Sequence, residues 1–319
     1  MEVNMNVLIT GGTGYIGSVL VDESINAGHN TYVLTRSKAK SKGLEMQGAK
    51  VIVGDMLQDG QWQQTINEMD AVIHLAAPPT WGKKVTKKVA LTYADGHLQL
   101  TKRLFDAINP KQLKHLVFVG GTSYFGDSGN KEAKSELFQS DPKGWGPYIA
   151  PSIKYAKEKI AEGYPASIVF PAQIYGPSSW MEQLYLQPLF MNKPLTTLKG
   201  YAPYFSPIHI EDCARALLHV IEHGKIGEDY IISDLQQLPS SVFRGEIIKL
   251  MGVKEPKFRV VPRWLCQLIL GPVLTEYATA HTNFSSKKLQ ETGFKFRYPT
   301  YQEGLSQVVK VWLQKQKQL

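Results

Sequence analysis

Short apolar runs alternate with longer segments of helical period along the first half of the chain. Runs rich in Val and Ile, each separated from the next by room for a helix, are typical of βαβ units. The strands of such a parallel sheet are apolar throughout because helices cover both faces. The pattern predicts an α/β fold with a doubly wound parallel sheet. The expected strands are NVLIT (6–10), TYVLT (31–35), KVIV (50–53), AVIHL (71–75), HLVFV (115–119) and SIVF (167–170).

The pattern changes after Pro171, where PAQIYGPSSW (171–180) is rich in turn residues. Helical periodicity returns near residues 181–192, 211–223 and 240–251, while strand patterns become sparse. We therefore expect a main domain over 1–170 and a smaller, mostly helical lobe over 171–319, with 205–235 returning to the main sheet. The apolar stretch WLCQLILGPVL (264–274) is shorter than a membrane span and is predicted to be a helix that lines a pocket.

Composition narrows the function classes. The two cysteines, Cys213 and Cys266, show neither a CxxC nor a metal-ligand pattern, so we expect reduced thiols and no metal site. The net charge of +8 comes from scattered basic residues, which argues against a nucleic-acid partner. The N-terminus runs into a strand pattern without a signal peptide. These features predict a cytoplasmic protein with a small-molecule substrate and no membrane contact.

The strongest motif is NVLITGGTGYIGS (6–18), which supplies a strand, a glycine turn and a helix in that order. Its glycines satisfy both GxGxxG and GxxGxxG, the pattern of a Rossmann dinucleotide site. A pyrophosphate bound there would face the N-terminus of the helix that begins near Tyr15. The alternative is a glycine-rich connection that binds nothing. The predicted cofactor-binding residues of this turn are Gly11, Gly12, Thr13, Gly14, Tyr15, Ile16 and Gly17.

The end of the second predicted strand bears on the choice of dinucleotide. NAD sites of this kind usually place a carboxylate there, whereas TYVLTRSKAK offers Arg36. A guanidinium suits the additional phosphate of NADP. The sequence therefore predicts a preference for NADP(H). If Arg36 is an ordinary surface residue, NAD(H) is accepted as well.

With these segments in order, the chain resembles the extended short-chain dehydrogenase/reductase family, also called the NAD-dependent epimerase/dehydratase family. GDMLQD (54–59) resembles its adenine-binding segment, and FSPIHIEDCARAL (205–217) its later strand and helix with a buried acid, here Asp212. SSKKLQETGFKFRYPTYQEGL (285–305) resembles its C-terminal signature. The resemblance implies a homodimer formed through helices at the sheet edge. It adds Asp55, Met56, Leu75, Ala76, Ala77 and Pro171 to the cofactor-binding residues.

The same resemblance assigns a catalytic pair. Tyr155 and Lys159 in YAKEKIAE match the family's YxxxK, in which the lysine lowers the tyrosine pKa and holds the nicotinamide ribose. Tyr148 is the competing tyrosine, but Ser152 stands four residues after it. The alternative for Tyr155 and Lys159 is a surface pair, because residues at i and i+4 share one face of any helix.

The third catalytic position departs from the family. Counting back from Phe125 places Gly121 where the family carries a Ser or Thr, so Thr122 or Ser123 is predicted to supply the hydroxyl, with Thr122 preferred. The alternative is that both hydroxyls only satisfy turn backbone groups. Sugar dehydratases of the family carry an acid pair after this hydroxyl, and Ser123 and Tyr124 stand there instead. Dehydration is therefore disfavoured.

These observations predict an NADP(H)-dependent oxidoreductase that transfers hydride between nicotinamide and a small carbonyl or alcohol. One alternative is a nucleotide-sugar epimerase of the same family. The other is a dinucleotide-binding sensor or assembly factor that has lost its chemistry. Fold by itself does not separate them.

Overall fold

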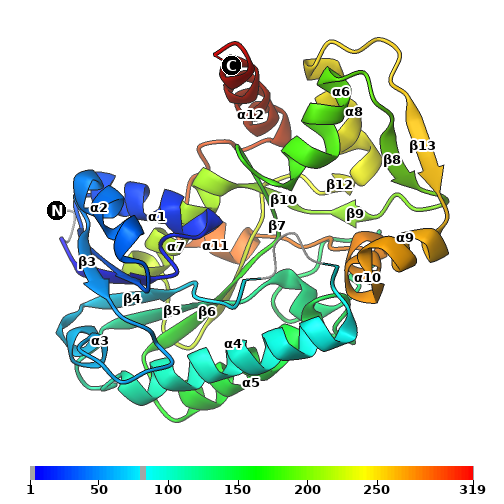
Figure 1. Ribbon diagram of the computed structural model, residues 1–319. Helices are drawn as coiled ribbons and strands as arrows, with labels where there is room; N and C mark the ends of the chain where they lie inside the picture. The colour runs from blue at the N-terminus through cyan, green and yellow to red at the C-terminus, as the bar shows by residue number, and fades with distance from the viewer. Residues whose placement is uncertain (1–3, 80–83, 319) are drawn as a thin grey trace.

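The computed structural model describes residues 4–79 and 84–318 and contains a central sheet of seven parallel strands (Figure 1). The strand order is β11-β6-β5-β4-β1-β2-β3, and every neighbouring pair is parallel. Each of the six predicted strands is present within one or two residues. These six are β1 Asn6–Thr10, β2 Asn30–Thr35, β3 Lys50–Val53, β4 Ala71–His74, β5 His115–Val119 and β6 Ala166–Pro171, and the seventh strand of the sheet is β11 Asp229–Ile232.

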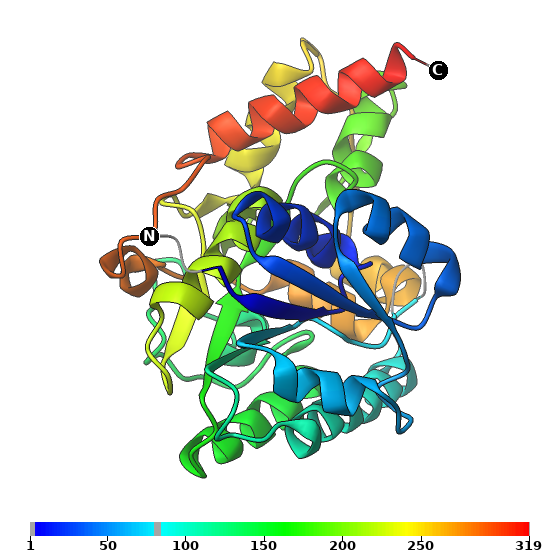
Figure 2. The same ribbon diagram turned by 90° about the vertical axis from the view of Figure 1, so that its left-hand side faces the viewer.

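Helices cover both faces of the sheet, as the doubly wound prediction requires (Figures 1 and 2). Side chains alternate along each strand, so Val7 and Ile9 enter the core under one helical layer and Leu8 enters the core under the other. The first layer contains α1 Tyr15–Asn26, α2 Lys38–Gln47, α7 Ile210–His223 and α11 Lys287–Glu291, and the second contains α3 Trp62–Thr65, η1 Ile66–Glu68, α4 Lys87–Ala107 and α5 Gly146–Ala161.

The chain returns to the main sheet after residue 205. The helix α7 packs beside α1, and β11 pairs with β6 in the register Asp229 to Ile168. The remaining elements build a lobe around a third apolar cluster that includes Tyr175, Phe243 and Trp312. This lobe contains η3 Glu182–Leu186, α6 Gln187–Phe190, α8 Ser240–Leu250 and α12 Tyr301–Gln316, together with the short strand pairs β7 Gln173–Tyr175 with β10 Pro207–His209, β8 Leu195–Leu198 with β13 Phe258–Val261, and β9 Tyr204–Phe205 with β12 Leu238–Pro239.

The apolar stretch 264–274 differs from its prediction. It is split at Gly271 into α9 Arg263–Leu270 and α10 Pro272–Thr279. Gly271 has φ +90°, and a Cβ atom there would lie 2.3 Å from the Val85 carbonyl oxygen, so the break is built into the packing. Trp264, Leu268 and Ile269 are 66%, 62% and 59% exposed, so α9 does not line a buried pocket. Among the described residues, no helix is long and apolar enough to cross a membrane.

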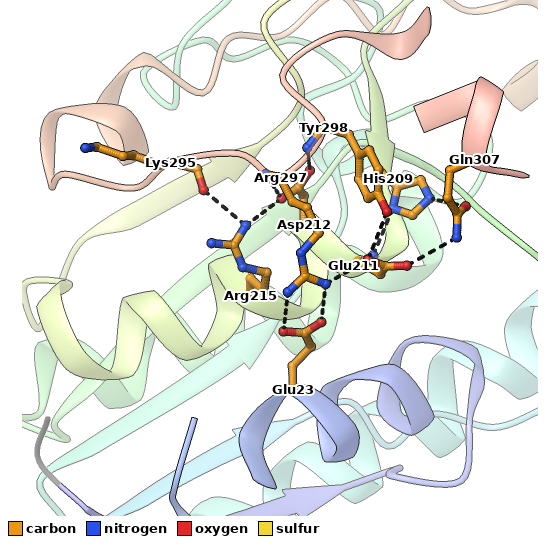
Figure 3. Close-up of polar contacts among 9 residues, drawn as sticks. All are labelled: Glu23, His209, Glu211, Asp212, Arg215, Lys295, Arg297, Tyr298 and Gln307. Carbon is orange, nitrogen blue, oxygen red and sulfur yellow. Dashed lines mark hydrogen bonds and ion pairs between the residues drawn. The ribbon is translucent and has the colours of Figure 1, made fainter. Parts of the chain in front are cut away.

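A buried carboxylate joins α7 to the C-terminal segment. Asp212 is fully buried, as its resemblance to the family's buried acid predicts. Its Oδ1 accepts hydrogen bonds from the Arg297 amide at 2.6 Å and the Arg215 guanidinium at 3.0 Å, and its Oδ2 accepts from the Tyr298 amide at 2.7 Å. Figure 3 shows these donors converging on one side chain. Both oxygens are therefore satisfied, which is what a buried charge needs.

The Arg297 side chain extends this connection to α1. Its guanidinium contacts Glu23 of α1 at 2.6 Å and Glu211 of α7 at 2.7 Å (Figure 3). The two carboxylates come from neighbouring helices, and without the arginine their like charges would repel each other. One arginine thus links α1, α7 and the segment that precedes α12.

Replacing Asp212 by Asn should lower the free energy of unfolding by roughly 2–4 kcal/mol. Asn has only one acceptor oxygen. In the variant its NH2 group would therefore face a backbone N–H that donates to a carboxylate oxygen in the wild type. Urea denaturation measures the difference. Asp95→Asn on the exposed side of α4 is the matched control and should change stability by less than about 0.5 kcal/mol. Equal stability of the two variants would contradict the role of Asp212.

Candidate functional site

The turn between β1 and α1 packs so tightly that Gly11 and Gly17 have no space for a side chain. A Cβ atom at Gly11, where φ is +73°, would lie 2.8 Å from the Leu75 carbonyl carbon. A Cβ atom at Gly17 would lie 2.2 Å from the Gly11 carbonyl oxygen. Gly14 is the N-cap of α1, so no side chain covers the first amides of the helix. A bare turn at a helix N-terminus fits a pyrophosphate.

A cleft of about 200 Å³ lies beside this turn. It lies at the carboxyl ends of β4 and β5, next to the point between β1 and β4 where the order of the strands along the chain reverses and open α/β sheets bind their ligands. Four predicted cofactor residues meet there, namely Ile16, Leu75, Ala76 and Ala77. The rest of its wall comes from His74, Val119 and Gly120 at the strand ends, Tyr93 and His97 of α4, and Ile149 of α5.

A larger hollow of about 300 Å³ lies at the edge of the sheet near β11. Charged groups on its wall already pair with each other, Lys157 with Asp229 at 2.6 Å and Lys288 with Glu228 at 2.5 Å. It lacks the glycine turn. We therefore assign the dinucleotide to the cleft beside Gly11 and not to this hollow.

The residues predicted for the adenine side follow β2 and β3. Arg36 is exposed directly after β2, and no carboxylate of the described residues lies within 4.0 Å of its guanidinium. Asp55 is half-buried, and its Oδ1 accepts a hydrogen bond from the Leu57 amide at 3.0 Å. Met56 is buried, and its carbonyl accepts from the Arg103 side chain. Contacts of these residues with a cofactor stay predictions.

Three other predicted cofactor residues have different surroundings. Thr13 is half-buried in the glycine turn, and Tyr15 begins α1 with its hydroxyl near Gly176. Pro171 is buried as the last residue of β6 and lies opposite Ile232 in the sheet. Its role at the cofactor also stays a prediction.

The pair Tyr155 and Lys159 lies away from the cleft. Six residues separate Tyr155 from Ile149, about 9 Å along the axis of α5. The Tyr155 ring packs edge-on against Phe105, near the C-terminal end of α4, with 6.0 Å between ring centroids. The Lys159 ammonium pairs with Glu162 at 2.6 Å. The geometry therefore argues against the predicted catalytic role.

The electrostatics of Tyr155 also differ from the prediction. Burial raises its pKa above the ordinary value, and the Asp106 carboxylate raises it further. Lys159 acts in the opposite direction but does not reverse the shift. The expected activation of the phenol is absent from the protein alone.

Tyr148 is the tyrosine of α5 that lies at the level of the cleft. It is half-buried on the first turn of the helix, directly before Ile149, and its ring lies 6.4 Å from that of Trp145. Trp145 in turn packs against Tyr93 of the cleft wall at 5.1 Å. Ser152 occupies the position four residues later, is fully buried, and has an Oγ without a hydrogen-bond partner among the described residues. Tyr148 therefore lies nearer to the cleft than Tyr155 does, but no lysine stands four residues after it.

The segment predicted to supply a hydroxyl forms a short 3-10 turn, η2 Thr122–Phe125, after β5. Thr122 is buried and Ser123 is half-buried. Gly121 is extended, and a Cβ atom there would meet Ile149 at 3.7 Å, an ordinary contact. A side chain could therefore be accommodated at Gly121. The assignment of Thr122 or Ser123 as the catalytic hydroxyl stays a prediction.

Two histidines form part of the cleft wall that the sequence analysis did not predict. The Ala76 amide donates to Thr10 Oγ1, and that hydroxyl lies 2.8 Å from His74 Nδ1. Within the described part of the chain the hydroxyl has no other acceptor, so it donates to Nδ1 and the hydrogen of His74 stays on Nε2. That N–H and His97 Nδ1 have no partner in residues 4–79 and 84–318. Behind the cleft wall there are thus two buried polar atoms without a hydrogen-bond partner among the described residues.

Burial keeps both imidazoles neutral. It lowers the pKa of His74 to about 3 and that of His97 to about 4. For His74 the proximity of His97 adds to the shift. Periodicity alone could have placed His97 on the inner face of its helix, because it lies three residues after Ala94 and four before Thr101, which are both buried.

A bare glycine turn at a helix N-terminus, beside a cleft at the switch point of a doubly wound sheet, defines a dinucleotide-binding α/β protein. The family model for the NAD dependent epimerase/dehydratase family matches residues 7–233. The chain belongs to this family. A second model, described as a domain of unknown function (DUF1731), matches residues 261–308.

Known relatives cover almost the whole chain. A dihydroflavonol 4-reductase from Zea mays is 23% identical over 343 residues, which span 97% of this chain and 88% of that protein. The structure of dTDP-glucose 4,6-dehydratase from Bacillus anthracis in complex with NAD has a TM-score of 0.80 at 18% identity and covers 98% of each chain. The structure of human epimerase family protein SDR39U1 with NADPH has a TM-score of 0.78 at 18% identity, covering 96% of this chain and 99% of that one. Family membership supports a nicotinamide dinucleotide as cofactor.

The protein should lose stability as the pH falls from about 6.5 toward 4. His97 is neutral in the folded state but binds a proton in the unfolded state below its ordinary pKa, so acid favours unfolding. Its contribution between pH 7 and 4.5 is about 2–3 kcal/mol. Urea denaturation at both pH values should show a smaller acid loss for His97→Gln than for the wild type. Gln99→Asn on the exposed face of the same helix is the control and should keep the wild-type slope. The same slope for both variants would contradict the shift.

Proposed function

We propose that this protein is an NADPH-dependent reductase, or the reverse dehydrogenase, for a small and weakly polar carbonyl or alcohol. The observation that carries the proposal is the cleft with apolar wall residues Ile16, Leu75 and Ile149, of which Leu75 packs against Gly11 of the glycine turn. Ligand pockets of this kind bind through apolar contact and use a few polar groups for orientation. A reductase such as the maize dihydroflavonol 4-reductase is among the relatives of similar length.

The proposed cofactor orientation follows from the turn. The pyrophosphate would lie over Gly14 and the first amides of α1, and the additional phosphate of NADP would meet Arg36 after β2. Arg36 is exposed and carries no ion pair among the described residues, so its charge is available. When bound, the cofactor supplies or accepts the hydride.

The protein's own part is to position the carbonyl and supply a proton. We assign the proton to Tyr148, because its ring lies beside Trp145, which packs against Tyr93 of the cleft wall. In the reductive direction the phenol donates its proton to the oxygen as hydride reaches the carbon.

A second candidate function is a non-catalytic dinucleotide sensor. Ser152 stands four residues after Tyr148 where the family places lysine, and Gly121 offers no hydroxyl. A phenol without a neighbouring cation has a pKa too high for efficient proton exchange at neutral pH. This reading predicts cofactor binding without turnover.

Replacing Arg36 by Ala should weaken NADPH binding about 10- to 100-fold and leave NADH binding unchanged, because a charged hydrogen bond to the phosphate is worth about 1.5–3 kcal/mol. Fluorescence titration of each dinucleotide measures both constants. Lys40→Ala, in the exposed part of α2, is the matched control. Equal affinities of the wild type for NADH and NADPH would refute the preference for NADPH.

Replacing Tyr148 by Phe should lower turnover by about 10²- to 10⁴-fold through loss of the proton donor, with NADPH affinity within twofold of the wild type. NADPH oxidation is followed by absorbance with a panel of aldehydes and ketones that includes nucleotide 4-keto sugars. Tyr155→Phe is the matched variant on the same helix and should retain turnover.

Three other outcomes would change the assignment. Loss of turnover in Tyr155→Phe alone would return the catalytic role to the pair Tyr155 and Lys159. Conversion of a nucleotide sugar without net NADPH oxidation would identify an epimerase. Cofactor binding without turnover on any substrate would favour the sensor.

A further inference from the structure

The last turn of α7 carries the sequence HVIEH over residues 219–223. Residues at i, i+3 and i+4 lie on one face of a helix, so His219, Glu222 and His223 point the same way. One ligand atom from each lies within 4.8 Å of the other two. The His219 and His223 rings are 4.5 Å apart between centroids. Two imidazoles and one carboxylate therefore converge outside the cleft.

A hydrogen bond from outside the helix fixes the tautomer of His219. The Thr292 hydroxyl donates to the Leu289 carbonyl at 2.6 Å, because a carbonyl can only accept. The same hydroxyl oxygen lies 2.8 Å from His219 Nε2 and therefore accepts from Nε2–H. The lone pair of His219 is then on Nδ1. A threonine thus holds the ring as the outer partners of metal-ligating histidines do.

A buried histidine from another part of the chain lies close to Glu222. The His29 side chain is 2% exposed, and its Nδ1 faces the Met5 amide at 3.5 Å. The hydrogen of His29 then lies on Nε2, which is 3.0 Å from Glu222 Oε1. The second carboxylate oxygen, Oε2, faces His223 Nε2 at 3.7 Å. Glu222 therefore has one oxygen beside a buried histidine, without hydrogen-bond geometry between them, and one directed to the cluster.

We propose that His219, Glu222 and His223 bind a divalent metal ion of the Zn²⁺ class. Two imidazole nitrogens and one carboxylate oxygen suit Zn²⁺, whereas Mg²⁺ and Ca²⁺ require sites built from oxygen. In a tetrahedral Zn²⁺ site the ligand atoms are about 3.4 Å apart. In the free protein the ligand atoms are farther apart, within 4.8 Å of one another. The exposed His223 side chain can move to bring them closer.

The proposed metal site lies where the end of α7 meets two other segments of the chain, so a bound ion should affect stability. Thr292 follows α11, and His29 lies just before β2, so the outer partners join the end of α7 to two distant segments. A metal ion bound only by the folded protein would stabilise this junction by mass action. None of its three ligands lines the cleft, so turnover should not depend on the metal. The assignment is independent of the oxidoreductase proposal.

Isothermal titration of ZnCl2 into the full chain, prepared without a histidine tag, tests the site. The wild type should bind one ion per chain, and His223→Ala should weaken the binding at least tenfold. Glu246→Gln on α8 is the matched control and should bind as the wild type does, because its carboxylate pairs only with Lys249 among the described residues. Thr292→Val leaves the three ligands intact and should weaken binding 10- to 100-fold.

A thermal readout covers the case in which a variant folds poorly. Zn²⁺ should raise the Tm of the wild type, EDTA should reverse the rise, and His223→Ala should show neither change. Absence of binding at 100-fold excess of ion would overturn the proposal. So would binding that His223→Ala and Thr292→Val leave unchanged, because the ion would then be on other surface groups.

Discussion

The cofactor site depends on how closely α1 approaches the turn that precedes it. A single methyl group at residue 17 would lie 2.2 Å from the Gly11 carbonyl oxygen, so only glycine permits this approach. The same approach keeps the first amides of α1 free of side chains and opens them to a ligand. Arg297 then holds α1 against α7, which links the stability of the lobe to the position of the turn.

The cleft beside this turn keeps the features expected of a cofactor site, but it lacks a lysine near Tyr148. Tyr148 lies at the level of Ile149 on α5, but the residue four positions later is the buried Ser152 and not a lysine. His74 Nε2 and His97 Nδ1, which have no hydrogen-bond partner among the described residues, are buried behind the same wall. A neutral imidazole can orient a hydroxyl or a carbonyl but cannot lower the pKa of a phenol as an ammonium does. The account therefore favours a slow reductase or a reductase whose substrate is intrinsically reactive.

The fold and the glycine turn could be predicted because both are local patterns. Six strands follow from apolar runs, and the turn follows from the spacing of Gly11, Gly14 and Gly17. The catalytic tyrosine could not be chosen by spacing, because the depth of a residue along α5 depends on where the helix begins. A Cβ atom at Gly146 would lie 2.1 Å from the Ser123 carbonyl, so a tertiary contact fixes that beginning. Cysteine spacing led to the expectation of no metal site, whereas the HxxEH spacing on α7 would have indicated the histidine cluster.

A crystal structure of the protein with NADPH tests the central claim most directly. In that structure the pyrophosphate should lie over Gly14 and the amides of α1, the additional phosphate should contact Arg36, and the nicotinamide should enter the cleft bounded by Ile149. A dinucleotide bound elsewhere, or a nicotinamide ring against Tyr155 and Lys159, would contradict it.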